Sequence, residues 1–120
     1  MDESSAHALA AEWVAAWNAH DLDAILAHYD EAVEFRSPFV ARLTGDPVDV
    51  VRGRAALRDY FAAALAAYPA LRFELHEVAV GVDSLVLRYT SVNGLQAYEE
   101  MTLGAGGRVT AVRAHYAQPA

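Results

Sequence analysis

The spacing of the apolar residues changes near residue 70, and this change constrains the fold more than any other feature of the sequence. Before it, Leu9, Trp13 and Trp17 recur every four residues, which predicts a helix with one broad apolar face. Apolar residues at helical spacing predict two further helices, over 22–29 and 54–68. The first part of the chain is therefore expected to be mainly helical.

After the change, the chain has the pattern of short strands separated by tight turns. Asn93-Gly94 and Gly106-Gly107 are residue types that tolerate the positive φ angles of hairpin turns. The runs between the turns are rich in Val, Leu and Tyr, which predicts an antiparallel meander. Its strands are expected at 71–82, 84–92, 96–103 and 108–118.

One strand is expected ahead of the third helix, in the stretch AVEFRSPF at residues 32–39. The alternation places Val33, Phe35 and Ser37 on one face of this strand. Pro38 ends the run, because proline cannot donate to a sheet. Ser37 is thus a small hydroxyl at the end of an apolar face, which suggests that this face borders a cavity.

The order of the elements predicts an α+β fold. Residues 40–53 carry turn formers and are expected to be a loop between the first strand and the third helix. We expect a single domain over residues 1–120, with residues 1–7 as a mobile N-terminus.

Composition narrows the class of protein. The chain is 55% hydrophobic and 21% charged, as expected of a globular domain. It has no cysteine, so disulfides and thiol chemistry are excluded. The net charge of −7 argues against nucleic acid as a partner. No apolar run is long enough to span a membrane, and the acidic N-terminus lacks the basic start of a signal peptide, so we expect a cytoplasmic protein.

Three segments resemble the landmarks of the SnoaL-like family, within the nuclear-transport-factor-2-like (NTF2-like) superfamily. They are WNAHDLDAILAHYDEAVEFRSP, RGRAALRDYF and GGRVTAVRAHY, and the resemblance extends from about residue 8 to residue 117. It implies a cone in which three N-terminal helices pack on a strongly curved, mostly antiparallel sheet around a pocket. It also implies a small hydrophobic ligand, no cofactor, and a homodimer formed through the outer face of the sheet.

The resemblance does not by itself give an activity, because the superfamily includes steroid isomerases, polyketide cyclases, epoxide hydrolases, dehydratases and binding domains. Alignment to ketosteroid isomerase places its catalytic base at Ser37, its oxyanion tyrosine at Trp13 and its oxyanion acid at Glu99. A serine cannot abstract a carbon-bound proton without a base of its own. The chain is therefore not expected to follow that mechanism.

Glu99 is the first candidate catalytic residue. In QAYEEMTL, Ala97, Glu99, Met101 and Leu103 share a strand face, and the apolar members predict that this face is the inner one. A carboxyl group there would be desolvated, which raises its pKa unless a cation compensates.

Arg88, on the preceding strand, is the second candidate catalytic residue, because an inward guanidinium would orient Glu99. An Arg–carboxylate pair is also similar to part of the site of the family's epoxide hydrolases. The alternative is that Arg88 faces outward, since Leu85, Leu87 and Tyr89 form the more apolar face of that strand.

The expected substrate-binding residues are mostly aromatic side chains near the open end of the cone. No pair of histidines has ligand spacing with a carboxylate, so no metal site is expected. His115 is expected on the outer face, because alignment favours its neighbour Tyr116 for the pocket. The expected binding set is Trp13, Phe35, Ser37, Tyr60, Met101 and Tyr116.

Two functions remain open from the sequence. One is an acid–base enzyme of isomerase, cyclase or hydrolase type, acting on a small hydrophobic molecule through Glu99 and Arg88. The other is a non-catalytic ligand-binding or dimerisation domain of the same fold.

Overall fold

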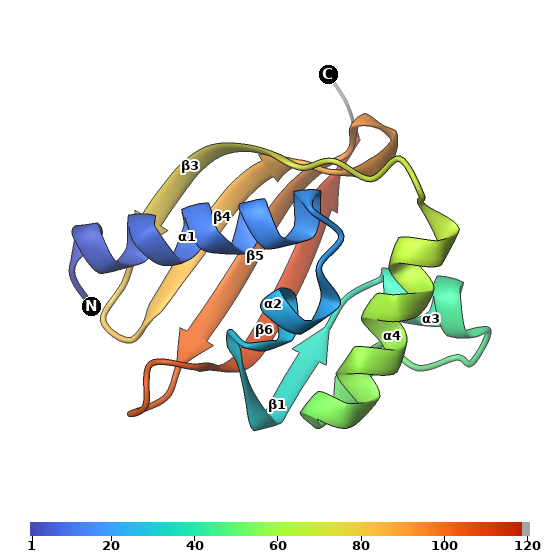
Figure 1. Cartoon of the computed structure of the whole chain (residues 1–120), viewed down its shortest axis with the longest axis horizontal. Helices are drawn as coiled ribbons and strands as arrows, with labels where there is room; N and C mark the ends of the chain where they lie inside the picture. Colours follow the sequence, from blue (N-terminus) through green and yellow to red (C-terminus); the bar gives the residue numbers. More distant parts are fainter. Residues whose placement is uncertain (119–120) are drawn as a thin grey trace.

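A computed structural model describes residues 1–118 of the chain, which form four α-helices, a short 3-10 helix and six strands. Figure 1 shows their arrangement. In chain order they are α1 (Glu3–Asn18), α2 (Leu22–Leu26), β1 (Tyr29–Arg36), α3 (Phe39–Thr44), β2 (Val50–Arg52), α4 (Arg54–Ala67), β3 (Glu74–Val80), β4 (Ser84–Thr90), η1 (Val92–Gly94), β5 (Gln96–Leu103) and β6 (Val109–Ala117).

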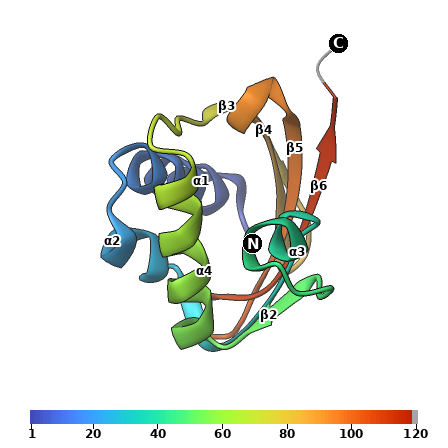
Figure 2. The same cartoon turned by 90° about the vertical axis from the view of Figure 1, so that its right-hand side faces the viewer.

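The strands form one sheet in the order β2-β1-β6-β5-β4-β3. Only β1 and β6 pair in parallel, and the other neighbours are antiparallel. Figure 2 shows α1, α2 and α4 on one side of this sheet. The predicted α+β fold and its mostly antiparallel sheet are therefore confirmed.

The first helices begin at side-chain caps. The Asp2 carboxylate accepts a hydrogen bond from the backbone N–H of Ser5 at 2.7 Å, and the Asp21 carboxylate accepts one from Ala24 at 3.1 Å. Such caps satisfy backbone donors that a helix start leaves free. The segment 1–7, predicted as a mobile N-terminus, contains the start of α1 at Glu3, and Ala6 is fully buried. None of the helices within residues 1–118 is long and apolar enough to cross a membrane.

Two predicted boundaries are wrong, both close to β1. The strand starts at Tyr29, where helical spacing predicted a helix over 22–29. The predicted loop at 40–53 contains α3 and β2. The Oγ atom of Ser37 accepts the Phe39 N–H at 3.2 Å, which starts α3, and β2 is held by pairing with β1.

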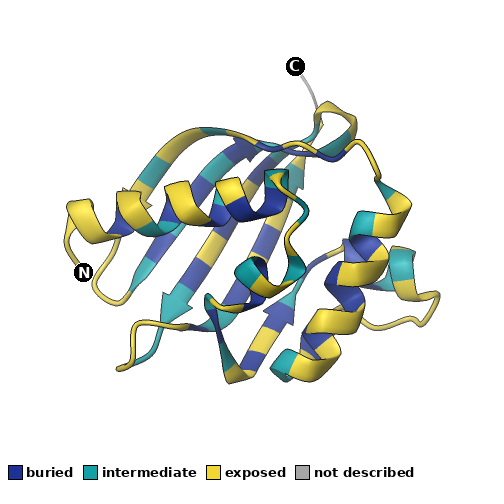
Figure 3. Cartoon of the chain, in the orientation of Figure 1, coloured by how far each residue is buried: buried dark blue, intermediate teal, exposed yellow. Residues whose placement is uncertain are grey.

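The core lies between the helices and the inner face of the sheet. Along β4, Leu85, Leu87 and Tyr89 are buried at 0–1% exposure, and the residues between them are partly exposed. Figure 3 shows the same alternation of buried and exposed residues along β5. The inner face packs under the helices, so any inward polar side chain on these strands is removed from water.

Candidate functional site

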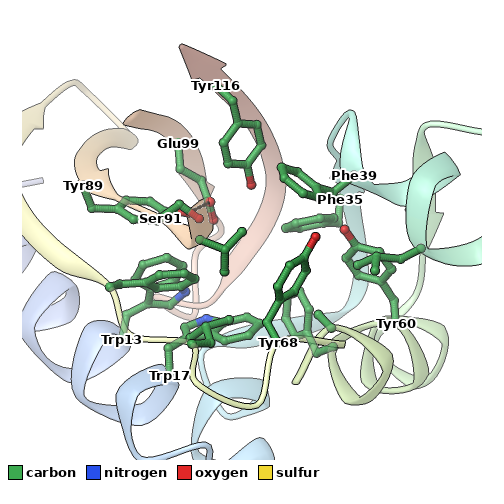
Figure 4. Close-up of a pocket in the computed structure, with 16 residues that line it drawn as sticks. Trp13, Trp17, Phe35, Phe39, Tyr60, Tyr68, Tyr89, Ser91, Glu99 and Tyr116 are labelled. Atoms are coloured by element: carbon green, nitrogen blue, oxygen red, sulfur yellow. Dashed lines mark hydrogen bonds between the residues drawn. The ribbon is translucent and has the colours of Figure 1, made fainter. Parts of the chain in front are cut away.

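A cavity lies between the helix layer and the inner face of the sheet (Figure 4). Its volume is about 60 Å³. Its wall is mostly aromatic and aliphatic. It is formed by Trp13, Trp17, Phe35, Phe39, Leu43, Tyr60, Phe61, Ala64, Tyr68, Leu71, Phe73, Tyr89, Ser91, Val92, Glu99 and Tyr116.

A depression on the surface adjoins the cavity between the end of α4 and η1. It is lined by residues 67–72 and 91–93, and it shares Tyr68, Leu71, Ser91 and Val92 with the cavity.

Glu99 is the one acidic side chain in the cavity wall, and it is 2% exposed. Its Oε1 atom accepts a hydrogen bond from the Tyr89 hydroxyl at 2.7 Å. Burial raises the pKa of Glu99 to about 7, and the Tyr89 hydrogen bond lowers it in part. None of the described residues that line the cavity is a Lys, Arg or His, so no cation at the wall opposes the effect of burial. The carboxyl group can therefore hold or release a proton near neutral pH.

Phenol groups share the cavity wall with this carboxyl. Burial raises the pKa of Tyr60, Tyr89 and Tyr116, and the nearby negative charge of Glu99 raises it further. Hydrogen bonding to the Ser37 hydroxyl lowers the pKa of Tyr60 and Tyr116 in part. These phenols stay neutral at any physiological pH, so they can donate hydrogen bonds to a carboxylate or to a ligand oxygen.

The structure brings five of the predicted site residues together at the cavity. Glu99 lies on β5, as the apolar alternation predicted, and the aromatic side chains lie on α1, β1, α4 and β6. The aromatic residues in question are Trp13, Phe35, Tyr60 and Tyr116.

Arg88 does not reach the cavity, so the prediction that it orients Glu99 is wrong. Register explains this, because Arg88 lies opposite Tyr98 and Leu87 lies opposite Glu99. Opposed residues of neighbouring strands point to the same face of the sheet. Arg88 therefore points outward, where its Nε atom lies 3.4 Å from the Oε1 atom of Glu77.

Two residues of the predicted binding set are buried but do not line the cavity. Met101 is fully buried and lies in the core opposite Leu85 and Val112, because it is one strand repeat beyond Glu99. Ser37 is 3% exposed, and its Oγ atom accepts the Phe39 N–H at 3.2 Å. The prediction that Met101 and Ser37 bind the ligand directly is therefore wrong, and both residues pack behind the cavity wall.

Sequence reasoning missed part of the wall. Tyr89 holds Glu99, and its position on the face of Leu85 and Leu87 is the pattern that could have revealed it. Phe73 and Leu71 lie within the strand predicted over 71–82, but β3 starts only at Glu74, and both residues precede it in a segment without regular structure. His115 is exposed on the outer face, as expected, with its Nδ1 atom 3.2 Å from the Tyr98 carbonyl oxygen.

Residues 1–118 contain no group of three or more His, Asp or Glu side chains placed to hold a metal ion. Among the described residues that line the cavity, Glu99 is the one titratable group with a pKa near neutrality.

The mostly antiparallel six-stranded sheet and the helix layer on one of its faces define the class of cone-shaped α+β folds. The chain belongs to the SnoaL-like family, whose domain matches residues 10–117. No functionally curated protein matches it.

Solved structures give the same fold. A SnoaL-like protein of unknown function from Burkholderia thailandensis is 38% identical, with 98% of each chain covered and a TM-score of 0.93. SalBIII, an epoxide hydrolase/cyclase-like enzyme with a role in pyran ring formation in the polyether salinomycin, is 24% identical, with 98% of this chain and 94% of that chain covered and a TM-score of 0.78. A proposed ketosteroid isomerase from Kribbella flavida is 16% identical, with 98% of this chain and 81% of that chain covered and a TM-score of 0.75.

Proposed function

We propose that this protein is a cofactor-independent acid–base enzyme that acts on a small, neutral, largely apolar molecule in the cavity. Glu99 is the proton-transfer group of this proposal. The observation that carries it is the placement of Glu99, a buried carboxyl held at one oxygen by Tyr89 in a mostly apolar wall. Buried charged groups are costly unless paired, so an unpaired carboxyl in a cavity is a candidate for chemistry.

The proposed step uses the two forms of the Glu99 carboxyl in turn. The neutral carboxyl gives its proton to a substrate oxygen as a C–O bond to that oxygen breaks. An incoming hydroxyl or water forms the new C–O bond and gives its proton to the carboxylate. The carboxyl ends the cycle as it began, so ring closure or ring opening of this kind needs no cofactor.

The pKa of Glu99 suits this step. General acid–base groups work best when their pKa is close to the working pH, and burial brings the pKa of Glu99 to about 7. Tyr89 has a further role in the proposal, because its hydroxyl fixes the Oε1 atom and leaves the Oε2 atom to exchange protons. The likeness of the fold to SalBIII supports the cyclase or hydrolase type of reaction over the others.

A second function, non-catalytic binding of the same class of ligand, is favoured by one observation. The alignment position of the catalytic base holds Ser37, whose hydroxyl already engages the Phe39 N–H. A chain with a single proton-transfer group in its pocket could retain the ligand site and have lost the reaction.

Turnover of defined compounds tests the proposal. Purified protein is incubated with a panel of small hydroxy-epoxides and cyclic unsaturated ketones, and products are identified by mass spectrometry and NMR. We expect conversion of at least one compound by the wild type, and a loss of at least a hundredfold in Glu99→Gln.

The neighbouring acid provides a matched control. Glu100 is exposed on the outer face of the same strand, so Glu100→Gln should keep the wild-type rate. Equal rates in the wild type and Glu99→Gln would refute the role of Glu99. Binding of panel compounds without conversion of any of them would favour the binding function.

A further inference from the structure

Trp17 carries a buried hydrogen-bond donor that has no partner. Its side chain lies in the cavity wall and is 5% exposed. Within residues 1–118, the indole Nε1 of Trp17 is the one fully buried side-chain nitrogen or oxygen without a hydrogen bond. The other tryptophan differs in this respect, because the Trp13 Nε1–H donates to the Tyr29 hydroxyl at 2.9 Å.

The rings around Trp17 do not supply an oxygen acceptor. The nearest of its ring partners is Phe61, with centroids 4.8 Å apart and planes at 72°. An aromatic face is a much weaker acceptor than an oxygen atom. A buried donor left unsatisfied destabilises the folded chain, and proteins usually avoid this cost unless the group has another role.

The position of Trp17 suggests that role. Trp17 lies on α1 and Glu99 lies on β5, so they belong to the helix wall and the sheet wall of one cavity. Figure 4 shows the Trp17 nitrogen on the upper edge of the indole, the side on which Tyr89, Ser91 and Glu99 lie. A ligand oxygen that reached this edge of the indole would meet a free donor on the helix wall, with the Glu99 carboxyl on the sheet wall.

We infer that Trp17 is a specificity-determining residue, whose indole N–H binds an acceptor oxygen of the ligand. This inference rests on the proposed function for the cavity and adds the chemical class of the ligand. The ligand is a neutral, compact molecule with a carbonyl or ether oxygen that points to the helix wall. An anionic ligand does not fit, since Glu99 contributes negative charge and no described residue of the wall is a Lys, Arg or His.

Two probes that differ in one group test the inference. Cyclohexanone and methylenecyclohexane have nearly the same shape, but only the ketone has an acceptor oxygen. The chain has two tryptophans, so its ¹⁵N–¹H spectrum has two indole signals, and the signal missing from Trp17→Phe is that of Trp17. With the wild type, cyclohexanone should move the Trp17 signal downfield, and methylenecyclohexane should not. The Trp13 signal serves as the internal control, since its N–H is already bound.

Affinity gives a second readout. Trp17→Phe should weaken cyclohexanone binding about fivefold to tenfold, the loss of one hydrogen bond, and leave methylenecyclohexane binding unchanged. An unmoved Trp17 signal in wild-type protein saturated with cyclohexanone overturns the inference, even if Trp17→Phe fails to fold. In that case Glu99-dependent turnover would still stand. If neither probe binds the wild type, the inference is overturned, and only turnover of larger compounds could preserve the proposed function.

Discussion

Replacing Glu99 by glutamine should stabilise the protein at neutral and alkaline pH. Glutamine has the size of a neutral glutamic acid, and its carbonyl oxygen can accept the Tyr89 hydrogen bond that Glu99 accepts at 2.7 Å. The substitution therefore removes the ionisation of the carboxyl and keeps the packing around it. Any change of stability with pH that it abolishes belongs to that single group.

The sign and size of this stability change follow from the pKa of Glu99. Burial of the carboxyl raises this pKa from 4.5 to about 7. Below pH 4.5 the carboxyl is neutral in both the folded and the unfolded chain. Between pH 4.5 and 7 it ionises only in the unfolded chain, so the stability of the wild type falls as the pH rises. Above pH 7 the loss is constant at about 3 kcal/mol, from about 1.36 kcal/mol for each pKa unit.

Urea unfolding followed by tryptophan fluorescence measures this effect, with both proteins compared at each pH from 5 to 8. The free energy of unfolding of Glu99→Gln should exceed that of the wild type by an amount that grows by about 2–3 kcal/mol over this range. Glu100→Gln, at an exposed position, should show a difference that does not change with pH. A constant difference for Glu99→Gln would mean that Glu99 is ionised throughout, which would refute the desolvation argument.

Three further substitutions test other contacts. Asn18→Ala should lower the free energy of unfolding in urea by about 2–3 kcal/mol. The reason is that the Asn18 side chain donates to the Phe73 carbonyl at 3.0 Å and accepts from the Phe73 N–H at 2.7 Å. Hydrogen exchange at the Phe73 amide should be faster in this variant. Arg88→Ala should change stability by less than about 0.5 kcal/mol and leave turnover intact, because its ion pair with Glu77 is exposed; a large loss of turnover would contradict its outward position. Gly53→Ala should lower the free energy of thermal unfolding by about 1–2 kcal/mol, because Gly53 has φ +88°, a backbone angle that strains an alanine. An unchanged Tm would show that the backbone relaxes and relieves this strain.

The period of the apolar residues was enough to predict the fold class. Residues 54–68 were expected to be a helix, and α4 is Arg54–Ala67, because a one-sided apolar stripe is stable only when it packs on another layer. The strands of the meander were predicted for the same reason, with a period of two. Where structure depended on contacts distant in sequence, the prediction failed, as it did for β2, whose three residues form a strand only because β1 lies beside them.

Within the site, the inward direction of Glu99 could be predicted from the sequence, because Ala97 and Met101 on either side of it favour a buried face. The sequence by itself could not determine which residues meet that carboxyl. The pairing of Leu87 with Glu99 turns Arg88 outward, and Tyr89 takes the place that the arginine was expected to fill. Register and the packing of α1 on the sheet decide such contacts, and both depend on the whole chain folding at once, so only the tertiary structure shows that Tyr89 holds Glu99 and that Trp17 keeps a free donor.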